Sequence, residues 1–158
     1  MWKILAKFQH IPSTMITTDP TVKVLNSLLR GELSAIETYS QVIHKFPDAA
    51  ALSRLKAIRS DHLESVAVLR MLIKLREGDP DTDSGVWGSF AKAFEGAAAL
   101  LGIAPALAAL KQGEEHGVKE YQEAVNDDAM PAEVVAILES NLLPRLQSHV
   151  ASLPGLAA

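Results

Sequence analysis

Apolar side chains recur every three or four residues through most of this chain, which is the spacing of one face of an α-helix. The pattern predicts four long helices, at residues 21–45, 49–76, 106–125 and 131–153. A weaker pattern at residues 86–101 predicts a shorter helix inserted between the second and the third. Since no segment keeps the alternation of a half-buried strand, we expect an all-α protein with its long helices packed as a bundle.

Proline and capping residues mark where these helices begin and end. Asp19 followed by Pro20 is typical of a helix start, with an N-cap and a proline at the first helical position. Residues 46–48 (Phe-Pro-Asp) end the first helix and start the second, and Pro105 separates the inserted helix from the third. Pro144 falls inside the fourth helix, where its missing N–H predicts a kink.

The first residues differ in pattern from the rest of the chain. Trp2, Leu5 and Phe8 share a helical face, but the apolar stretch is too short and too interrupted for a signal peptide. A segment lying on a membrane surface is one interpretation, and a short leader that packs on the domain or frays is the other. We expect a leader at residues 1–18 and one bundle domain at residues 19–158.

Composition excludes several classes of protein. The 158 residues include 15 Lys and Arg and 19 Asp and Glu, for a net charge of −4, which gives no general attraction to nucleic acid. The chain has no cysteine, so it forms no disulfide, zinc finger or cysteine-held iron–sulfur cluster. No apolar run approaches the length of about 20 residues that spans a bilayer. With no export signal recognised, we expect a cytoplasmic protein.

The first and third long helices carry an internal repeat. Gly31-Glu32 is followed by Tyr39, and Gly113-Glu114 is followed by Tyr121, with the tyrosine seven residues after the glutamate in both cases. The second and fourth helices match more weakly. The chain therefore reads as two related helical hairpins, which predicts a bundle with approximate twofold symmetry.

Each long helix places one polar side chain in its apolar stripe. Glu32 lies on a seven-residue line with Leu25 and Tyr39, so it points toward the core. The same reasoning turns His62, Glu114 and His149 inward from the other three helices. Buried ionised groups are costly unless they pair with one another or bind a metal, so we expect these four to converge.

Two carboxylates and two imidazoles are suitable ligands for iron, manganese or zinc. We therefore take Glu32, His62, Glu114 and His149 as candidate metal ligands. Tyr39 and Tyr121 lie two turns from each glutamate on the same face, where each hydroxyl can bond a carboxylate of a facing helix behind the ligands.

Around these residues the sequence resembles the ferritin-like superfamily. From residue 21 to 153 it is most similar to a family of bacterial ferritin-like domain proteins without an assigned activity. The resemblance is carried by Gly31-Glu32 with Tyr39, Asp61-His62, residues 84–88 (Ser-Gly-Val-Trp-Gly) with Phe90, residues 113–117 (Gly-Glu-Glu-His-Gly) with Tyr121, and residues 142–144 (Leu-Leu-Pro) with His149. It implies a ferritin-like four-helix bundle, to which the apolar pattern adds the short inserted helix.

One departure from the superfamily bears on its chemistry. Its di-iron members carry Glu-x-x-His on the second and fourth helices. Here Arg59 stands three residues before His62, and Leu146 three residues before His149, so both bridging carboxylates are missing. A site for one metal or an asymmetric site, a metal-free network in which Arg59 neutralises a glutamate, and di-iron catalysis all remain open. Asp61 is a reserve ligand, and its alternatives are to pair with Arg59 or with another helix.

Two function hypotheses follow from this pattern. The first is a ferritin-like domain that binds a metal through Glu and His in its core, and whether it is an enzyme stays open. The second is a non-catalytic interaction module with a metal-free polar core, acting through the apolar stretch at residues 98–110. We expect a homo-oligomer, with a dimer favoured, no nucleic acid, no integral membrane segment and a protein partner of unknown kind.

Overall fold

The computed structural model describes residues 19–88, residue 92 and residues 102–157. The expected leader at residues 1–18 lies outside the described residues, as does most of the expected helix at residues 86–101, including Phe90 and Phe94. Of that helix the structure describes a short 3₁₀ turn, η1 (Gly85–Trp87).

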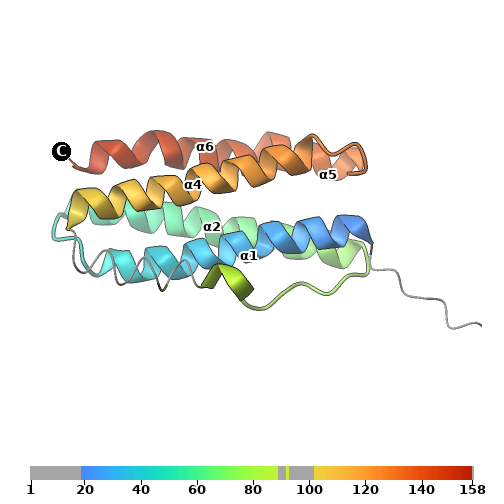
Figure 1. Cartoon of the computed structure of the whole chain (residues 1–158), viewed down its shortest axis with the longest axis horizontal. Coiled ribbons are helices and arrows are strands. Elements are labelled where there is room, and N and C mark those ends of the chain that lie inside the picture. The colour runs from blue at the N-terminus through green and yellow to red at the C-terminus, as the bar shows by residue number, and fades with distance from the viewer. Residues whose placement is uncertain (1–18, 89–91, 93–101, 158) are drawn as a thin grey trace, which may run out of the picture.

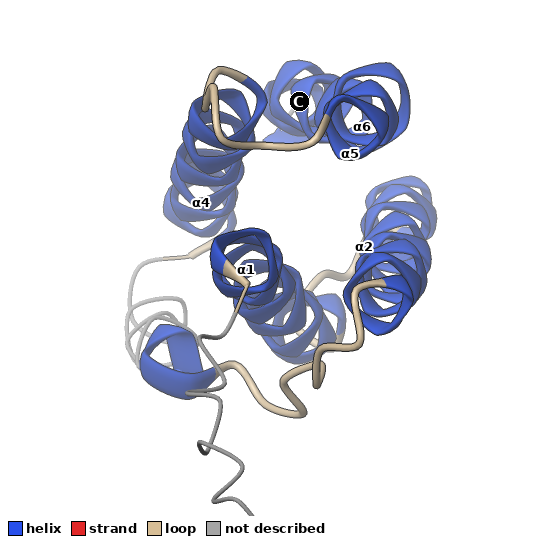
Figure 2. Ribbon diagram, turned by 90° about the vertical axis from the view of Figure 1, so that its right-hand side faces the viewer, coloured by secondary structure: helices blue, strands red, loops and turns tan. Residues whose placement is uncertain are grey.

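The described residues form helices, turns and loops, with no strand among them. Figure 1 shows α1 (Pro20–Ile43) beside α2 (Ala49–Leu75), and α4 (Ile103–Val125) beside a last rod made of α5 (Ala132–Ile137) and α6 (Leu143–Ser152). A 3₁₀ turn, η3 (Leu153–Ala157), follows α6. The end-on view in Figure 2 shows the four rods arranged around one centre, so the all-α prediction is confirmed for the described residues. Among them, no helix has an apolar stretch that could cross a membrane.

Local sequence accounts for the start of α1 and for the place of Pro105 in α4. The Asp19 carboxylate accepts a hydrogen bond from the backbone N–H of Thr21, as its predicted capping role requires. α4 begins at Ile103, three residues earlier than predicted. Pro105 falls in its first turn, where a missing N–H costs nothing because those donors have no partner inside the helix.

The fourth helix is more irregular than the expected kink at Pro144. A π-helical turn, η2 (Leu138–Leu142), separates α5 from α6, and the Leu143 N–H donates to the carbonyl of Leu138, five residues back. Proline has no N–H to offer the carbonyl four residues before it, and its ring crowds that carbonyl. A wider turn just ahead of Pro144 accommodates both effects, so the irregularity lies before the proline.

The connection between α2 and α4 runs back along α1. Its contacts follow α1 in chain order: the Asn26 amide donates to the Asp79 carbonyl at 3.0 Å, Arg30 pairs with Asp81, and the Ser84 hydroxyl donates to Glu37 at 3.0 Å. The connection therefore returns the chain to the end of the bundle at which α1 ended. Because of this return, α4 runs antiparallel to α1 (Figure 1).

The core has two apolar layers with a polar layer between them. One layer gathers residues 22–29, 66–73 and 121–146, and the other gathers residues 39–58, 106–110 and Leu153. On every rod the chain passes from one layer to the other through a single buried Glu or His. These four residues are Glu32, His62, Glu114 and His149.

Candidate metal centre

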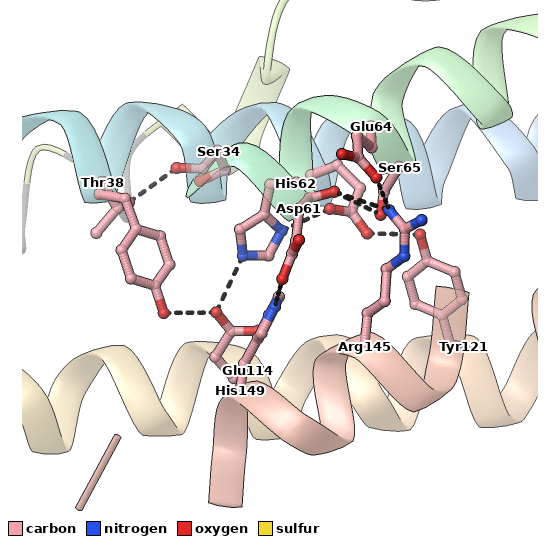
Figure 3. A network of polar contacts seen from close by, with 12 residues as sticks. Ser34, Thr38, Asp61, His62, Glu64, Ser65, Glu114, Tyr121, Arg145 and His149 are labelled. Atoms are coloured by element: carbon pink, nitrogen blue, oxygen red, sulfur yellow. Dashed lines mark hydrogen bonds and ion pairs between the residues drawn. The ribbon is translucent and has the colours of Figure 1, made fainter. Parts of the chain in front are cut away.

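The four inward-pointing side chains come from four different helices and converge in the polar layer. Glu32 lies on α1, His62 on α2, Glu114 on α4 and His149 on α6, and each is exposed by only 2–4%. Figure 3 shows His62, Glu114 and His149 turned toward one another. The structure therefore brings together the four residues that the heptad pattern selected.

His62 is held between two carboxylates. Its Nδ1 lies 2.6 Å from Glu32 Oε2 and its Nε2 lies 3.0 Å from Glu114 Oε1. Burial by itself would lower the pKa of His62, but the two negative charges outweigh burial and raise this pKa from 6.5 to about 10. Without a metal, His62 is therefore an imidazolium that donates a hydrogen bond to each carboxylate.

Glu114 is the most connected carboxylate in the layer. Burial alone would raise its pKa, but the hydrogen bonds and charges of His149 and His62 lower it from 4.5 to about 2. One oxygen faces His62 and the other lies 3.3 Å from Nδ1 of His149. Glu114 is therefore ionised across the physiological range and links the two histidines.

The two tyrosines cross between the hairpins as the sequence predicted. The Tyr39 hydroxyl donates to Glu114 Oε1 and the Tyr121 hydroxyl donates to Glu32 Oε1, both at 2.6 Å. Burial and the neighbouring carboxylate charges raise the pKa of both phenols well above 10. Both therefore stay protonated and serve as fixed donors that orient the glutamates.

The second ring nitrogen of His149 contacts Asp61. Its Nε2 lies 3.0 Å from Asp61 Oδ2, and the Asp61 side chain is 44% exposed. Asp61 was a reserve ligand by sequence, with a partner on another helix as one of its alternatives, and the structure gives it that partner. The polar layer therefore reaches solvent on the side of Asp61.

Arg59 does not take the place that the sequence suggested. Its guanidinium donates to the Ser40 hydroxyl at 2.6 Å, and none of its observed hydrogen bonds or ion pairs reaches a buried glutamate. The half-buried position of Arg59 explains this difference, because its long side chain follows the surface of α2 toward α1. The alternative in which Arg59 neutralises Glu32 or Glu114 is therefore wrong in that detail, while a metal-free network without Arg59 stays a prediction.

Another arginine, Arg145 on α6, borders the layer and was not singled out from the sequence. Its guanidinium donates to the Asp61 carbonyl at 3.4 Å and pairs with Glu64 at 3.1 Å (Figure 3). The signal for it was present, because Arg145 stands one helical turn before His149 on the same side. It ties α6 to α2 next to the His149–Asp61 contact.

Three of the residues are close enough to share one metal ion. His62, Glu114 and His149 each offer one ligand atom, and these atoms all lie within 4.8 Å of one another. Two imidazoles and one carboxylate suit zinc, iron or manganese. Glu32 contacts His62 from the other side, and Asp61 contacts His149, so each histidine already has a carboxylate partner that can orient its ring.

The fold and this cluster define an all-helical protein with a buried Glu/His layer. Residues 20–127 match the model of a protein family described as a domain of unknown function (DUF2383), and the chain belongs to this family. The matched range includes Glu32, His62 and Glu114 but ends before His149. No curated protein and no solved structure matches the chain.

Proposed function

We propose that this bundle binds one divalent transition metal ion through His62, Glu114 and His149. The observation that carries the proposal is the approach of these three ligand atoms to within 4.8 Å of one another in a buried layer. A bound ion would displace the protons that the imidazoles carry toward the carboxylates, and it would supply a positive charge for Glu32 and Glu114. Iron, manganese and zinc all suit this ligand set.

We further propose that the arrangement is ferritin-like. The glutamates stand on the first and third rods and the histidines on the second and fourth, and one long connection returns along α1. Ferritin-like folds have this order of ligands and a single long crossover. The missing bridging carboxylates favour one ion over two, since a close pair of cations needs such bridges.

Metal binding is tested on the whole chain, stripped with a chelator and titrated with Co²⁺, whose visible spectrum reports its ligands. We expect one ion per chain for the wild type, and at least about tenfold weaker binding for Glu114→Gln and His149→Gln. His44→Gln is the matched control, because His44 is an exposed histidine at the end of α1. Failure of the folded wild type to bind Co²⁺, Zn²⁺, Fe²⁺ or Mn²⁺ overturns the proposal.

A second candidate function is a metal-free interaction module. It is favoured because the buried polar side-chain atoms of the layer all have hydrogen-bond partners without a metal. In the described part of the chain, the one buried side-chain polar atom without a partner is Gln41 Oε1, which lies outside that layer. Within the surface expected at residues 98–110, Ala106, Leu107 and Leu110 are buried, Ile103 is 41% exposed, and residues 98–101 lie outside the described residues, so this surface stays a prediction.

An exposed apolar stripe on α2 offers a different surface. Leu63, Met71 and Leu75 are exposed by 45%, 50% and 73%, and they stand at multiples of four residues along one side of the helix. An antiparallel second copy would set Leu63 against Leu75, so the apolar stripe can pack against itself. We propose a twofold dimer through this face as the second candidate.

Sedimentation of the wild type and of Met71→Glu tests the dimer. We expect a concentration-dependent dimer that the substitution abolishes, while Lys23→Glu, at an exposed position of α1, leaves it unchanged. A wild type that stays monomeric at high concentration contradicts this second candidate and has no bearing on metal binding.

A further inference from the structure

A cavity of about 340 Å³ lies between α1 and α4 and reaches the polar layer from one side. His62, Glu32 and Glu114 are among its lining residues, whereas His149 and Asp61 are not. The layer therefore has two different sides, one facing this cavity and the other reaching solvent at Asp61. A cavity of this volume is within the range of small-molecule binding sites.

Small residues on both helices leave this space open. Gly31 and Ala35 line it from α1, and Gly113 and Gly117 line it from α4, in both cases one helical turn apart. Close approach of a neighbouring helix is one reason for a glycine such as Gly31 within a helix. A Cβ atom built there would meet only Glu120 Oε2, at an ordinary 3.5 Å, so tight packing does not explain this glycine. Gly117 does have a close neighbour, since a Cβ would lie 2.8 Å from Leu146 Cδ2.

The lining combines an apolar wall with an acidic character. Leu28, Leu110 and Leu146 contribute to a surface that is mostly apolar. Three carboxylates line the cavity, those of Glu32, Glu114 and Glu120, against two histidines, His62 and His116, and no Lys or Arg is among the described lining residues. Such a lining favours an apolar molecule and disfavours an anion.

We propose that this cavity binds a compact, mainly apolar molecule that carries one uncharged nitrogen donor. The inference rests on the proposed function: three protein ligands leave a metal ion with an open position, and the cavity reaches two of those ligands, His62 and Glu114. The donor atom takes the open position and the apolar body lies along the leucines. A heteroaromatic nitrogen base has this combination of properties.

The test uses the Co²⁺-loaded whole chain and three probes followed by the visible spectrum. 4-Phenylimidazole combines an uncharged donor with an apolar body, imidazole lacks the body, and benzoate replaces the donor with an anion. We expect 4-phenylimidazole to bind about tenfold tighter than either of the others, because its phenyl group is buried in the cavity and it brings no negative charge.

Cavity-filling variants locate the binding. Gly31→Leu and Ala35→Leu fill the space without replacing a proposed ligand, and we expect each to weaken 4-phenylimidazole about tenfold or more while one Co²⁺ per chain is retained. Lys23→Leu adds the same side chain at an exposed position of α1 and serves as the matched control. Circular dichroism confirms that each variant is folded, and Ala35→Leu carries the test if Gly31→Leu is not.

The outcomes separate the two proposals. A chain that binds no Co²⁺ overturns the metal site and this inference together. A chain that binds Co²⁺ but shows no spectral change with 4-phenylimidazole overturns the cavity proposal alone, as does equal affinity in the wild type and the filled variants. Tighter binding of benzoate than of 4-phenylimidazole would also overturn the cavity proposal, because it contradicts the argument from the acidic lining.

Discussion

The two hairpins of this bundle carry related sequences, yet they hold their histidines in different ways. His62 of the first hairpin lies between two buried carboxylates, at 2.6 and 3.0 Å. His149 of the second hairpin lies between Glu114, at 3.3 Å, and Asp61, which is 44% exposed. One histidine is locked in the interior, and the other connects the interior to the surface.

The difference arises from neighbours that the repeat does not share. Asp61 precedes His62, whereas Ser148 precedes His149, so only α2 supplies an additional carboxylate and it supplies it to the opposite hairpin. The last rod also contains the π-helical turn that α2 lacks. An approximate duplication can thus copy the positions of polar residues while their partners diverge.

Replacing each histidine in turn in the metal-free protein should show the difference between the two hairpins most clearly. We expect His62→Ala to lower the free energy of unfolding by roughly 3–5 kcal/mol, because it leaves two buried carboxylates without their shared cation. His149→Ala should cost about 1–3 kcal/mol, since Glu114 keeps His62 and Tyr39 as partners. Urea unfolding in excess chelator, followed by circular dichroism, measures both. Equal losses would remove the distinction.

The two tyrosines test the feature in which the hairpins are alike, namely the hydrogen bond that each hairpin donates to a carboxylate of the other. Tyr39 and Tyr121 each donate to a carboxylate of the other hairpin at the same distance of 2.6 Å. We expect Tyr39→Phe and Tyr121→Phe to lose similar amounts of stability, about 1.5–3 kcal/mol each, because each removes a hydrogen bond to a charged group. The same urea titration applies. A loss confined to one tyrosine would mean that the asymmetry extends beyond the histidines.

The pH dependence of stability sharpens the special position of His62. Its pKa is 6.5 in the unfolded chain and about 10 in the folded one, so its contribution is complete below pH 6.5 and declines as the pH rises toward 10. The decline has a limiting slope of about 1.4 kcal/mol per pH unit. Glu114 acts in the opposite direction, and its contribution is lost as the pH falls from 4.5 toward 2.

Urea unfolding of metal-free protein at pH 6, 8 and 9.5 measures the alkaline loss. His62→Gln should abolish most of it, and His149→Gln should retain it. An alkaline loss that survives in His62→Gln would assign the effect to other groups.

The smallest effect belongs to the surface end of the layer. Asp61→Asn removes a charge next to His149, but Asp61 is 44% exposed, so we expect a loss of less than about 1 kcal/mol. The loss should shrink further in high salt, because exposed pairs are screened. A salt-independent loss larger than that for His149→Ala would show that Asp61 matters more than its exposure suggests.

Seven-residue spacing was enough to locate the polar layer in advance. It placed Glu32, His62, Glu114 and His149 in the core, and the offset of seven residues placed each tyrosine opposite the carboxylate of the other hairpin. These predictions succeed because a regular helix turns sequence spacing directly into direction.

Other features depend on tertiary structure and could not be predicted from the sequence. Whether Gly31 permits close helix approach or borders a cavity depends on the distance between α1 and α4. That distance cannot be predicted from the residues around Gly31. The same holds for Arg59, whose position near His62 indicated charge in the core although its side chain follows the surface to Ser40. The π-helical turn was anticipated only as a kink, because Pro144 predicts a disturbance and not the geometry that absorbs it.

The returning connection has a consequence for the order in which the chain folds. Each hairpin brings together residues close in sequence, such as Glu32 and His62, which are 30 positions apart, whereas the Tyr121–Glu32 hydrogen bond spans 89. Contacts between residues far apart in sequence form late in folding, because closing a long loop costs chain entropy before the new contacts can offset that cost. We expect two preformed hairpins to dock in a final step, so that the polar layer is completed only when the rest of the molecule has already formed.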